Sequence, residues 1–381
     1  MTVEIKEVRS KSELEVFMSL PIELYKGFAE YVPPLTIETR GILDPKSAPF
    51  FEYGEATYWV AYKNGAPVGR ISAQIDNAQP AAAFGNAGLF GCLDAIDDIE
   101  VTTALFNTAE NWLKKKGYKS AVGPFMLNIN GQSGLLVEGH DLEPLTMAPW
   151  HPPYLKNHLE KLGCQQVRDL HFWRLQWSTE VESSYASRPK LPALPKDVTM
   201  RPLNFKNMDH DIEIIRNVFN DAWEDNWGFV PLQPEDVKAF NKELKPILKP
   251  EMGLIVEKQG KPLAVLVFIP NLFEFTGDLG TKPSPIGWLK LAWRIFRYRF
   301  NSGRVLLFGV SKKIRHSVGG AVIAMWTIEH LVTTLLNMQR KRGWVEAGWV
   351  LDNNEALQSI LTKHGFQKAR TLRLFERKFQ T

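Results

Sequence analysis

Cysteine is rare in this sequence of 381 residues, and the marks of export are missing. Cys92 and Cys164 are the only cysteines, and they lie far apart without a metal-binding spacing. We therefore expect two reduced thiols, no disulfide framework and no metal ion. Residues 1–6 lack the apolar core of a signal peptide, and no stretch approaches the ~18 apolar residues of a transmembrane helix. These absences predict a cytoplasmic protein.

Acidic residues are absent between Leu279 and Ile328, a segment that holds nine Lys or Arg residues. The net charge of the whole chain is only +4, which is too small to indicate nucleic-acid binding, so we expect no DNA partner. Hydrophobic residues make up 44% and charged residues 23%, values that are typical of a soluble globular protein. The length exceeds the usual size of a single core and predicts two domains.

Two common nucleotide-binding motifs are also missing, the Walker lysine-serine pair and G-x-G-x-x-G. In their place an apolar, β-prone segment at Val305–Val310 is followed by a basic turn, two glycines and a long apolar-periodic run to Arg342. Glycine lets backbone N–H groups approach an anion, and a helix N-terminus adds about half a positive charge there. The pattern predicts a strand, a phosphate-binding turn and a helix.

The spacing His316-x-x-Gly319-x-Ala321 resembles the pyrophosphate loop of the GNAT acyltransferases, with histidine in the first place. Downstream, residues 346–351 are expected to form a second strand, and Asn353-x-x-Ala356 begins a helix that ends at Gly365-Phe366. These residues resemble the second half of the GNAT signature, in which the fifth strand splays from the fourth and admits the acyl thioester arm.

The resemblance implies an N-acyltransferase that uses an acyl-CoA, most simply acetyl-CoA, and a small-molecule or peptide amine as acceptor. The matching positions that would hold the coenzyme are Val310, Arg315, His316, Gly319, Gly320, Ala321 and Asn353. One position departs from the family: GNAT enzymes commonly carry a tyrosine acid where this chain has Leu361. Either another group or water protonates the leaving thiolate, or the chemistry has been lost.

An internal repeat supports two copies of one fold. Leu159-x-Lys161-x-Gly163 matches Leu361-x-Lys363-x-Gly365 at a constant offset of 202, and both halves hold a hairpin, a strand, a helix, a strand, a helix and a last strand. We expect an α/β fold (α+β, mixed sheet) of two tandem GNAT-like domains. The expected ranges are 1–178 and 197–381, joined by a proline-punctuated linker at 179–196.

The N-terminal copy has lost the phosphate loop. Residues 94–100 stand in its place with four carboxylates and no glycine. Carboxylates at a helix N-terminus satisfy the dipole themselves and would repel a diphosphate. We expect this copy to serve a structural role or to form one wall of the acceptor site.

Few residues are candidates for catalysis or for binding the acceptor. Acyl transfer to an amine needs a base, and we predict Glu346 for this role, although it could equally face solvent or pair with a surface arginine. Trp227 and Phe229 lie where GNAT folds often build the acceptor pocket, and otherwise would pack helices together. Asn130 follows a strand of the first copy and could bind a polar acceptor or only fix its loop.

The stretch Ile286–Phe300 predicts a basic amphipathic helix with tryptophans. Such a helix can lie on an anionic bilayer as a peripheral contact, but packing as a lid over the interdomain groove is the simpler interpretation. Two other functions stay open. A Fem-type transferase that uses aminoacyl-tRNA would need a wide basic groove, which the span 282–315 allows, and an inactive ligand-binding protein would fit Leu361.

Overall fold

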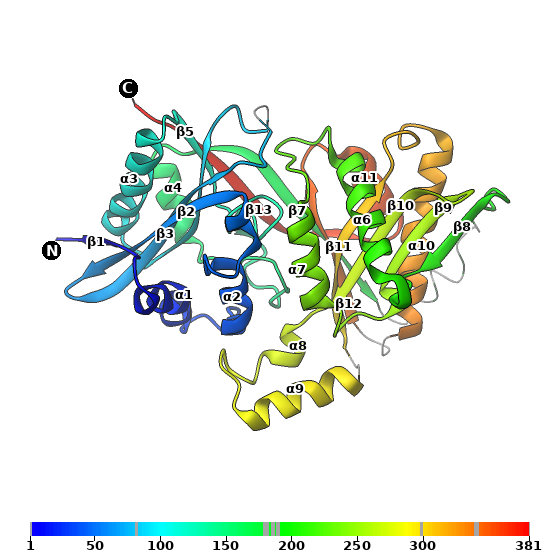
Figure 1. Cartoon of the computed structure of the whole chain (residues 1–381), viewed down its shortest axis with the longest axis horizontal. Coiled ribbons are helices and arrows are strands. Elements are labelled where there is room, and N and C mark those ends of the chain that lie inside the picture. Colours follow the sequence, from blue (N-terminus) through cyan, green and yellow to red (C-terminus); the bar gives the residue numbers. More distant parts are fainter. Residues whose placement is uncertain are drawn as a thin grey trace.

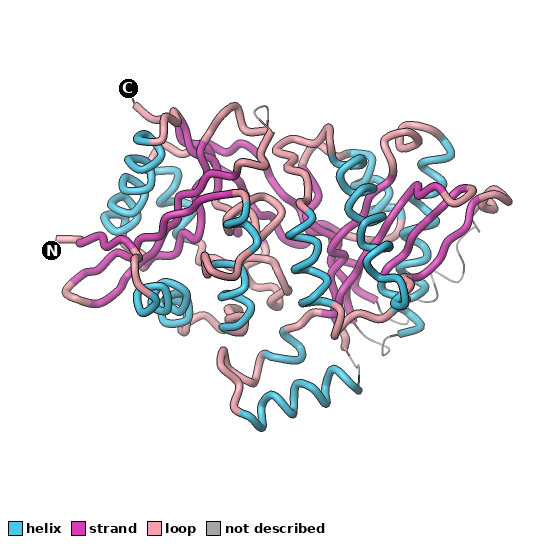
Figure 2. The backbone as a smooth tube through the Cα atoms, viewed as in Figure 1, coloured by secondary structure: helices cyan, strands magenta, loops and turns pink. Residues whose placement is uncertain are grey.

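The computed structural model describes residues 2–80, 83–177, 191–297, 300–338 and 343–380, together with Ser183 and Ser187. Most of the expected linker, and Arg342 at the end of the expected long helix, lie outside these residues. The backbone forms one twisted sheet with helices on its faces, and Figures 1 and 2 show its two halves side by side.

The first half of the chain supplies seven strands and four longer helices. In order they are β1 (Glu4–Glu7), α1 (Lys11–Tyr25), α2 (Thr36–Leu43), β2 (Gly54–Lys63), β3 (Ala66–Asp76), β4 (Gly88–Ala95), α3 (Ile99–Lys115), β5 (Ser120–Gly123), β6 (Leu135–Glu138), α4 (Tyr154–Lys161) and β7 (Gln165–Trp177).

The second half repeats this order with an insertion before its fourth strand. Its elements are β8 (Val198–Pro202), α6 (Met208–Trp223), α7 (Pro234–Leu244), β9 (Gly253–Lys258), β10 (Lys261–Pro270), α8 (Phe273–Thr276), α9 (Pro285–Arg297), β11 (Ser302–Val310), α10 (Val318–Met338), β12 (Gly343–Leu351), α11 (Glu355–Lys363) and β13 (Gln367–Lys378).

Thirteen strands form a single mixed sheet in the order β1-β2-β3-β4-β5-β13-β7-β12-β11-β10-β9-β8, with β6 paired to β13. The pairs β4–β5 and β11–β12 are parallel, and the other described pairs are antiparallel. The predicted α/β fold with a mixed sheet is therefore confirmed.

The two copies interlock through their last strands. β13, from the end of the second copy, lies between β5 and β7 of the first, and β7 pairs with β12 of the second copy. Figure 1 accordingly shows the red C-terminal strand running into the half built by the blue and cyan segments, where both ends of the chain lie. The ranges 1–178 and 197–381 thus remain a prediction about the sequence repeat, because the last strand of the second copy, β13, lies between two strands of the first copy.

Local signals explain why these elements begin and end where they do. Asn64 and Gly65 both adopt positive φ and make the turn between β2 and β3, as Asn-Gly predicts. Ser10 and Glu13 form a capping box at the start of α1, and Asp98 caps α3 through the backbone N–H of Glu100. α1 and α3 each bury an apolar face against β3.

α10 corrects one expectation from the sequence. Val318–Leu335 is long and apolar enough to cross a membrane by length and composition, although we expected no such stretch. In the fold 44% of this window is buried, and Ile328, Leu331 and Leu335 belong to the core of the second half. Figure 1 shows α6 in front of β10 and β11 with α10 behind them, so the apolar composition of α10 is that of a core helix.

Candidate functional site

β11 and β12 part halfway along their length. They pair in parallel only from Ser302 opposite Trp344 to Val305 opposite Ala347. β11 nevertheless continues to Val310, and β12 continues to Leu351. The splay expected from the motifs is therefore present, and Val310 lies beyond it at the end of β11, paired only with Ala264 on β10.

A cavity of about 190 Å³ fills the gap between the parted strands. Its walls are almost entirely apolar and come from β11, β12, α6, α7 and α11. They include Trp223, Leu306, Phe308, Trp349, Leu357 and Leu361. Leu361 is buried in this wall, so α11 presents a methyl group where GNAT enzymes commonly place a hydroxyl.

The loop between β11 and α10 has the features of an anion site. Ser317 caps α10, and its Oγ accepts a hydrogen bond from the Gly320 backbone N–H at 3.0 Å. Among the residues that the structure describes, the N–H groups of His316, Val318 and Gly319 have no acceptor, and Val318 and Gly319 are exposed. Three free N–H groups beside a helix N-terminus suit a diphosphate.

The two glycines of this loop differ in their surroundings. A Cβ on Gly320 would lie 2.0 Å from the carbonyl oxygen of Ile314, which no side chain could tolerate without movement of the backbone. A Cβ on Gly319 would meet only Ser317 Oγ at 3.7 Å. Gly320 is therefore required for the shape of the loop, whereas Gly319 leaves the approach to the N–H groups open. Ala321 donates its N–H to Ser317 O and lies within the helix.

Two basic residues of the loop, Lys312 and Arg315, are already paired. Arg315 contacts the Asp225 carboxylate and the Ala222 carbonyl, and Lys312 Nζ lies 2.9 Å from Asp225 Oδ1. His316 is exposed and accepts a hydrogen bond from Arg315 Nε at 3.2 Å. Arg315 thus stands beside the predicted phosphate position, but it must share its charge with Asp225.

Asn353 lies in the exposed turn after β12, and the neighbouring Asn354 caps α11 instead, since its side chain accepts from the Leu357 N–H at 3.2 Å. Asn353 forms no part of the wall of the smaller cavity. The sequence spacing therefore located the turn correctly, but the residue that fixes the helix is one position further along.

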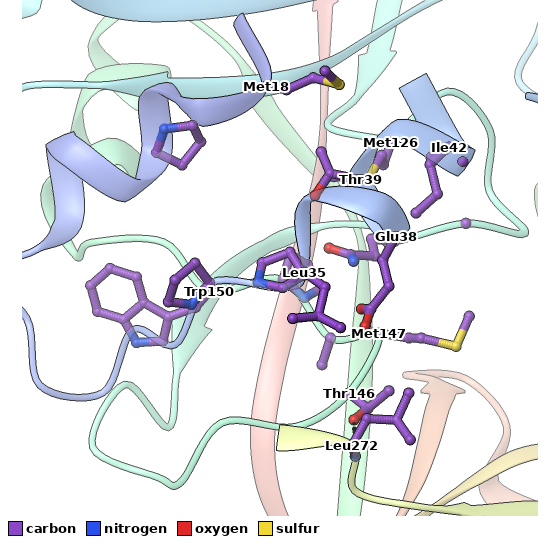
Figure 3. Close-up of a pocket in the computed structure, with 18 of the residues that line it drawn as sticks. Met18, Leu35, Glu38, Thr39, Ile42, Met126, Thr146, Met147, Trp150 and Leu272 are labelled. Carbon is purple, nitrogen blue, oxygen red and sulfur yellow. Dashed lines mark hydrogen bonds between the residues drawn. The ribbon is translucent and has the colours of Figure 1, made fainter. Parts of the chain in front are cut away.

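A second cavity, of about 800 Å³, lies beside the first. Figure 3 shows part of its wall, in which α1, α2 and loops of the first copy meet the segment before α8. Thr146 Oγ1 accepts a hydrogen bond from the Leu272 N–H at 2.6 Å and joins the two copies here. Five residues line both cavities: Asn130, Gly131, Met147, Phe240 and Leu244. A group in one cavity is therefore separated from the other by this shared wall alone.

Of the three predicted acceptor-pocket residues, one lines the cavities and two do not. Asn130 lies in the shared wall, where its Nδ2 also donates to the Val230 carbonyl at 3.0 Å. Trp227 and Phe229 line neither cavity. Trp227 packs edge-on against Phe84, and Phe229 packs near Phe219. These two aromatic side chains stabilise the contact between helices and loops, which was the alternative interpretation.

Glu346 is not placed to act as a base. It is fully buried on β12, and its carboxylate contacts Arg174 at 2.7 Å and Arg370 at 2.8 Å. The carboxylate is occupied by two guanidinium groups, and Glu346 lines neither cavity. The alternative prediction, a pair with an arginine, describes its environment, although the arginines are interior ones.

Sequence reasoning missed the polar side chains of the larger cavity. Figure 3 shows the Glu38 carboxylate of α2 directed into the cavity toward Met147, one of the shared-wall residues. Tyr53 donates to Asp236 at 2.9 Å and accepts from Asn128 Nδ2 at 3.1 Å, so this chain of groups spans the two copies. Burial raises the pKa of Asp236. No local motif marks these residues, because they meet only through the fold.

The N-terminal counterpart of the phosphate loop is occupied by its own side chains. Asp94 is buried, accepts from Tyr25 Oη at 2.8 Å and pairs with Arg70 at 2.7 Å. Asp98 caps α3 and binds Lys63 at 2.6 Å. These contacts are consistent with an N-terminal copy that holds no coenzyme. The absence of coenzyme from this copy stays a prediction.

The basic span 282–315 does not form a single groove in the part of the chain that the structure describes. Lys290 and Arg294 pair with Asp278, while Lys312 and Arg315 pair with Asp225. Arg304 is buried, and burial lowers its pKa to about 10. These five cations thus lie in three separate places.

Two relatives cover nearly the whole chain. Protein YghO of Escherichia coli (strain K12) is 36% identical over 373 residues, which are 98% of this chain and 95% of YghO. Bacterial ceramide synthase of Caulobacter vibrioides (strain NA1000 / CB15N) is 34% identical over 371 residues, 97% of this chain and 96% of that protein. No protein-family model matches the chain.

Solved structures share the fold at low sequence identity. A tandem GNAT protein from the clavulanic acid biosynthesis pathway superimposes with a TM-score of 0.59 at 11% identity, covering 100% of this chain and 99% of that one. A GCN5-related N-acetyltransferase from Sphaerobacter thermophilus gives a TM-score of 0.51 at 11% identity, covering 100% and 96%. The chain has the fold of these tandem GNAT proteins, and it belongs to the family that includes YghO and bacterial ceramide synthase.

Proposed function

We propose that this protein is an acyl-CoA-dependent N-acyltransferase whose acceptor is the amine of a long-chain lipid. The observation that carries the proposal is the pair of adjoining cavities, of about 190 and 800 Å³, that share five wall residues. Ligand pockets commonly measure about 300–1,000 Å³, so the larger cavity suits a ligand well beyond the size of a small amine. Its many apolar wall residues favour hydrocarbon chains.

The relatives support a lipid acceptor. A ceramide is a long-chain amino alcohol whose nitrogen carries a fatty acyl group, so an enzyme named ceramide synthase joins an acyl group to a lipid amine. The name of this relative also supports a fatty acyl donor in place of the acetyl group expected from the sequence. We therefore propose a longer acyl chain, with acetyl as the alternative that the assay below tests.

The residues of the C-terminal copy fit the coenzyme. The free N–H groups of His316, Val318 and Gly319 would bind the diphosphate, and the parted strands would admit the pantetheine arm beside Val310. When bound, acyl-CoA supplies an activated thioester. Phe240, Leu244 and Met147 in the shared wall would make the meeting point apolar and so help to exclude water.

A base must remove a proton from the acceptor, because an alkyl ammonium has a pKa near 10 and cannot attack a thioester. We assign this role to Glu38, whose carboxylate points into the larger cavity toward the shared wall (Figure 3). Leu361 offers no proton to the leaving thiolate. Water, or the proton that Glu38 has accepted, therefore completes the reaction.

The direct test is an assay of purified protein with acyl-CoA donors and amine acceptors, with amide products identified by mass. We expect stoichiometric release of coenzyme A and amide formation from palmitoyl-CoA and sphinganine, with little product from acetyl-CoA or from spermidine. Preference for acetyl-CoA and a polyamine would contradict the lipid proposal. Binding of acyl-CoA without thiol release in any pairing would favour the inactive ligand-binding protein that Leu361 allows.

A further inference from the structure

α9 lies at the edge of the molecule and carries most of the exposed large apolar side chains of the described residues. Figure 1 shows it below the sheet, joined to the body through α8. Seven large apolar side chains are exposed in the described residues, and five of them lie on α9. They are Ile286 (78% exposed), Trp288 (43%), Leu289 (72%), Trp293 (59%) and Phe296 (85%). Packing as a lid, the simpler interpretation of the sequence, does not account for these exposed groups.

Four of these side chains share one face of the helix. Ile286, Leu289, Trp293 and Phe296 follow one another at intervals of three, four and three residues, which is the spacing of a single helical stripe. The opposite side of α9 faces the protein, where Leu291 is buried and Ile295 is partly buried. Both of these residues line the larger cavity. One helix thus forms part of the cavity wall and presents an apolar stripe outward.

The orientation of α9 is fixed by ion pairs. Asp278 contacts Lys290 at 2.6 Å and also holds Arg294, whose guanidinium donates to the Phe275 carbonyl. Arg297 lies over the Trp293 ring at 5.0 Å. Because these contacts fix the rotation of the helix, the apolar stripe is held toward the outside.

The charges around the stripe are complementary to an anionic surface. The segment from Leu279 to Ile328 contains no Asp or Glu, and the Lys282 side chain is 75% exposed. A helix with a bulky apolar stripe, tryptophans and flanking cations is typical of helices that lie in the headgroup region of a bilayer. A second apolar group adjoins it, because Ile37 on α2 is 64% exposed and Thr36 N–H donates to Thr281 O at 2.8 Å.

We propose that α9 docks the protein on an anionic lipid bilayer. Docking places the α8–α9 edge of the larger cavity against the membrane, so a lipid amine enters the cavity from the bilayer without crossing water. The docking itself does not depend on the enzymatic activity. The entry of the acceptor by this route rests on the proposed function.

Vesicle flotation with the full-length protein tests the docking. We expect the protein to float with vesicles of phosphatidylcholine and phosphatidylglycerol, and to float much less with phosphatidylcholine alone. Phe296→Asp should weaken this binding about tenfold or more, because it removes a large exposed side chain and adds a negative charge. Val318→Asp is the matched control, since Val318 is also apolar and 84% exposed but lies on α10, and its flotation should equal that of the native protein.

Three results would overturn the docking proposal. The first is absence of flotation with the anionic vesicles, and the second is equal flotation of Phe296→Asp and the native protein. The third is a native dimer in solution that Phe296→Asp converts to a monomer without any vesicle binding, which would make the stripe a contact between two copies of this chain. Circular dichroism melting of Phe296→Asp, expected to match the native protein, excludes unfolding as the cause.

An activity comparison separates docking from the proposed function. With sphinganine dispersed in detergent, Phe296→Asp should form the amide at the native rate, whereas with sphinganine embedded in anionic vesicles its rate should fall about tenfold or more. Equal rates of both proteins on vesicles would overturn entry from the bilayer. If neither protein forms amide in detergent while the native protein still floats, the proposed function fails and the docking stands.

Discussion

Arg370 Nε lies 2.8 Å from Glu346 Oε2, and this contact ties β13 to β12 across the intervening β7. Arg174, on β7 itself, places its Nη2 2.7 Å from Glu346 Oε1. These are the strands through which the two copies interlock. The buried carboxylate and its two arginines therefore stabilise the join between the copies, and Glu346 is a structural residue.

Glu346→Gln should destabilise the fold. Removal of the buried acid leaves the buried Arg370 without its counter-charge and Arg174 with only the exposed Glu143, so we expect the free energy of unfolding to fall by about 3–5 kcal/mol. Urea denaturation measures the change. Glu143→Gln is the matched control, because Glu143 also pairs with Arg174 but its side chain is 60% exposed, and its loss should cost no more than about 1 kcal/mol. An unchanged stability with a collapsed acyl-transfer rate would instead restore Glu346 as the base.

Gly320→Ala should impair coenzyme binding, whereas Gly319→Ala should not. The new Cβ at position 320 would lie 2.0 Å from Ile314 O and displace the loop, but at position 319 it would meet only Ser317 Oγ at 3.7 Å. Thermal shift with acyl-CoA measures both, because a ligand at about 100 times its dissociation constant adds roughly 2.7 kcal/mol of stability. An equal response of both variants would place the diphosphate elsewhere. Gly319→Glu should abolish the response by repulsion.

Glu38→Gln should abolish amide formation without loss of donor binding. The carboxylate faces the shared wall, and loss of a general base commonly lowers kcat by about 10²–10⁴ (Figure 3). The amide product is measured by mass and donor binding by thermal shift. Asp236→Asn is the comparison variant, since Asp236 accepts from Tyr53 and from the Gln233 N–H as part of the α7 cap. A larger loss of rate in Asp236→Asn than in Glu38→Gln would move the base to Asp236.

His151 should make the fold sensitive to acid. Burial lowers the pKa of His151 to about 4, against about 6.5 for an unfolded chain. The native state therefore resists protonation, so the stability that neutral His151 contributes is present above about pH 6.5 and is lost as pH falls toward 4, by about 3 kcal/mol in all.

Urea denaturation of the native protein and of His151→Gln across this pH range isolates the effect. A glutamine oxygen can still accept the Leu136 N–H that His151 Nδ1 accepts at 3.2 Å. The difference in unfolding free energy between the two proteins should shift in favour of the variant as pH falls. A constant difference would show that His151 takes up its proton without cost in the fold.

Much of the fold could be predicted from the sequence, because the residues that indicate it are either local, as in turns, or repeated between the two copies. The offset of 202 residues between Leu159 and Leu361 revealed the two copies, and turn residues such as Asn64-Gly65 marked the hairpins. The motif at His316–Ala321, together with the strand after it, also located the splay between β11 and β12. The exchange of β7 and β13 could not be found in this way, because strand neighbours are chosen by tertiary packing.

Only part of the candidate site could be predicted from the sequence. Its loop is encoded by one continuous segment, but its cavity walls bring together residues such as Glu38, Asn130 and Asp236 that are far apart in the chain. Glu346 was misassigned as the base because its arginine partners lie 172 and 24 residues away and no periodicity reports them. Trp227 was misplaced for the same reason, since its partner Phe84 belongs to the other copy.

The coenzyme site is tested most directly by a crystal structure with a non-hydrolysable long-chain acyl-CoA thioether. We predict the diphosphate on the N–H groups of His316, Val318 and Gly319, the sulfur between β11 and β12 beyond Val305, and the acyl chain reaching the shared wall at Met147. A thioether bound at the N-terminal loop around Asp98, or a crevice between β11 and β12 closed by Trp223 and Trp349, would contradict this prediction.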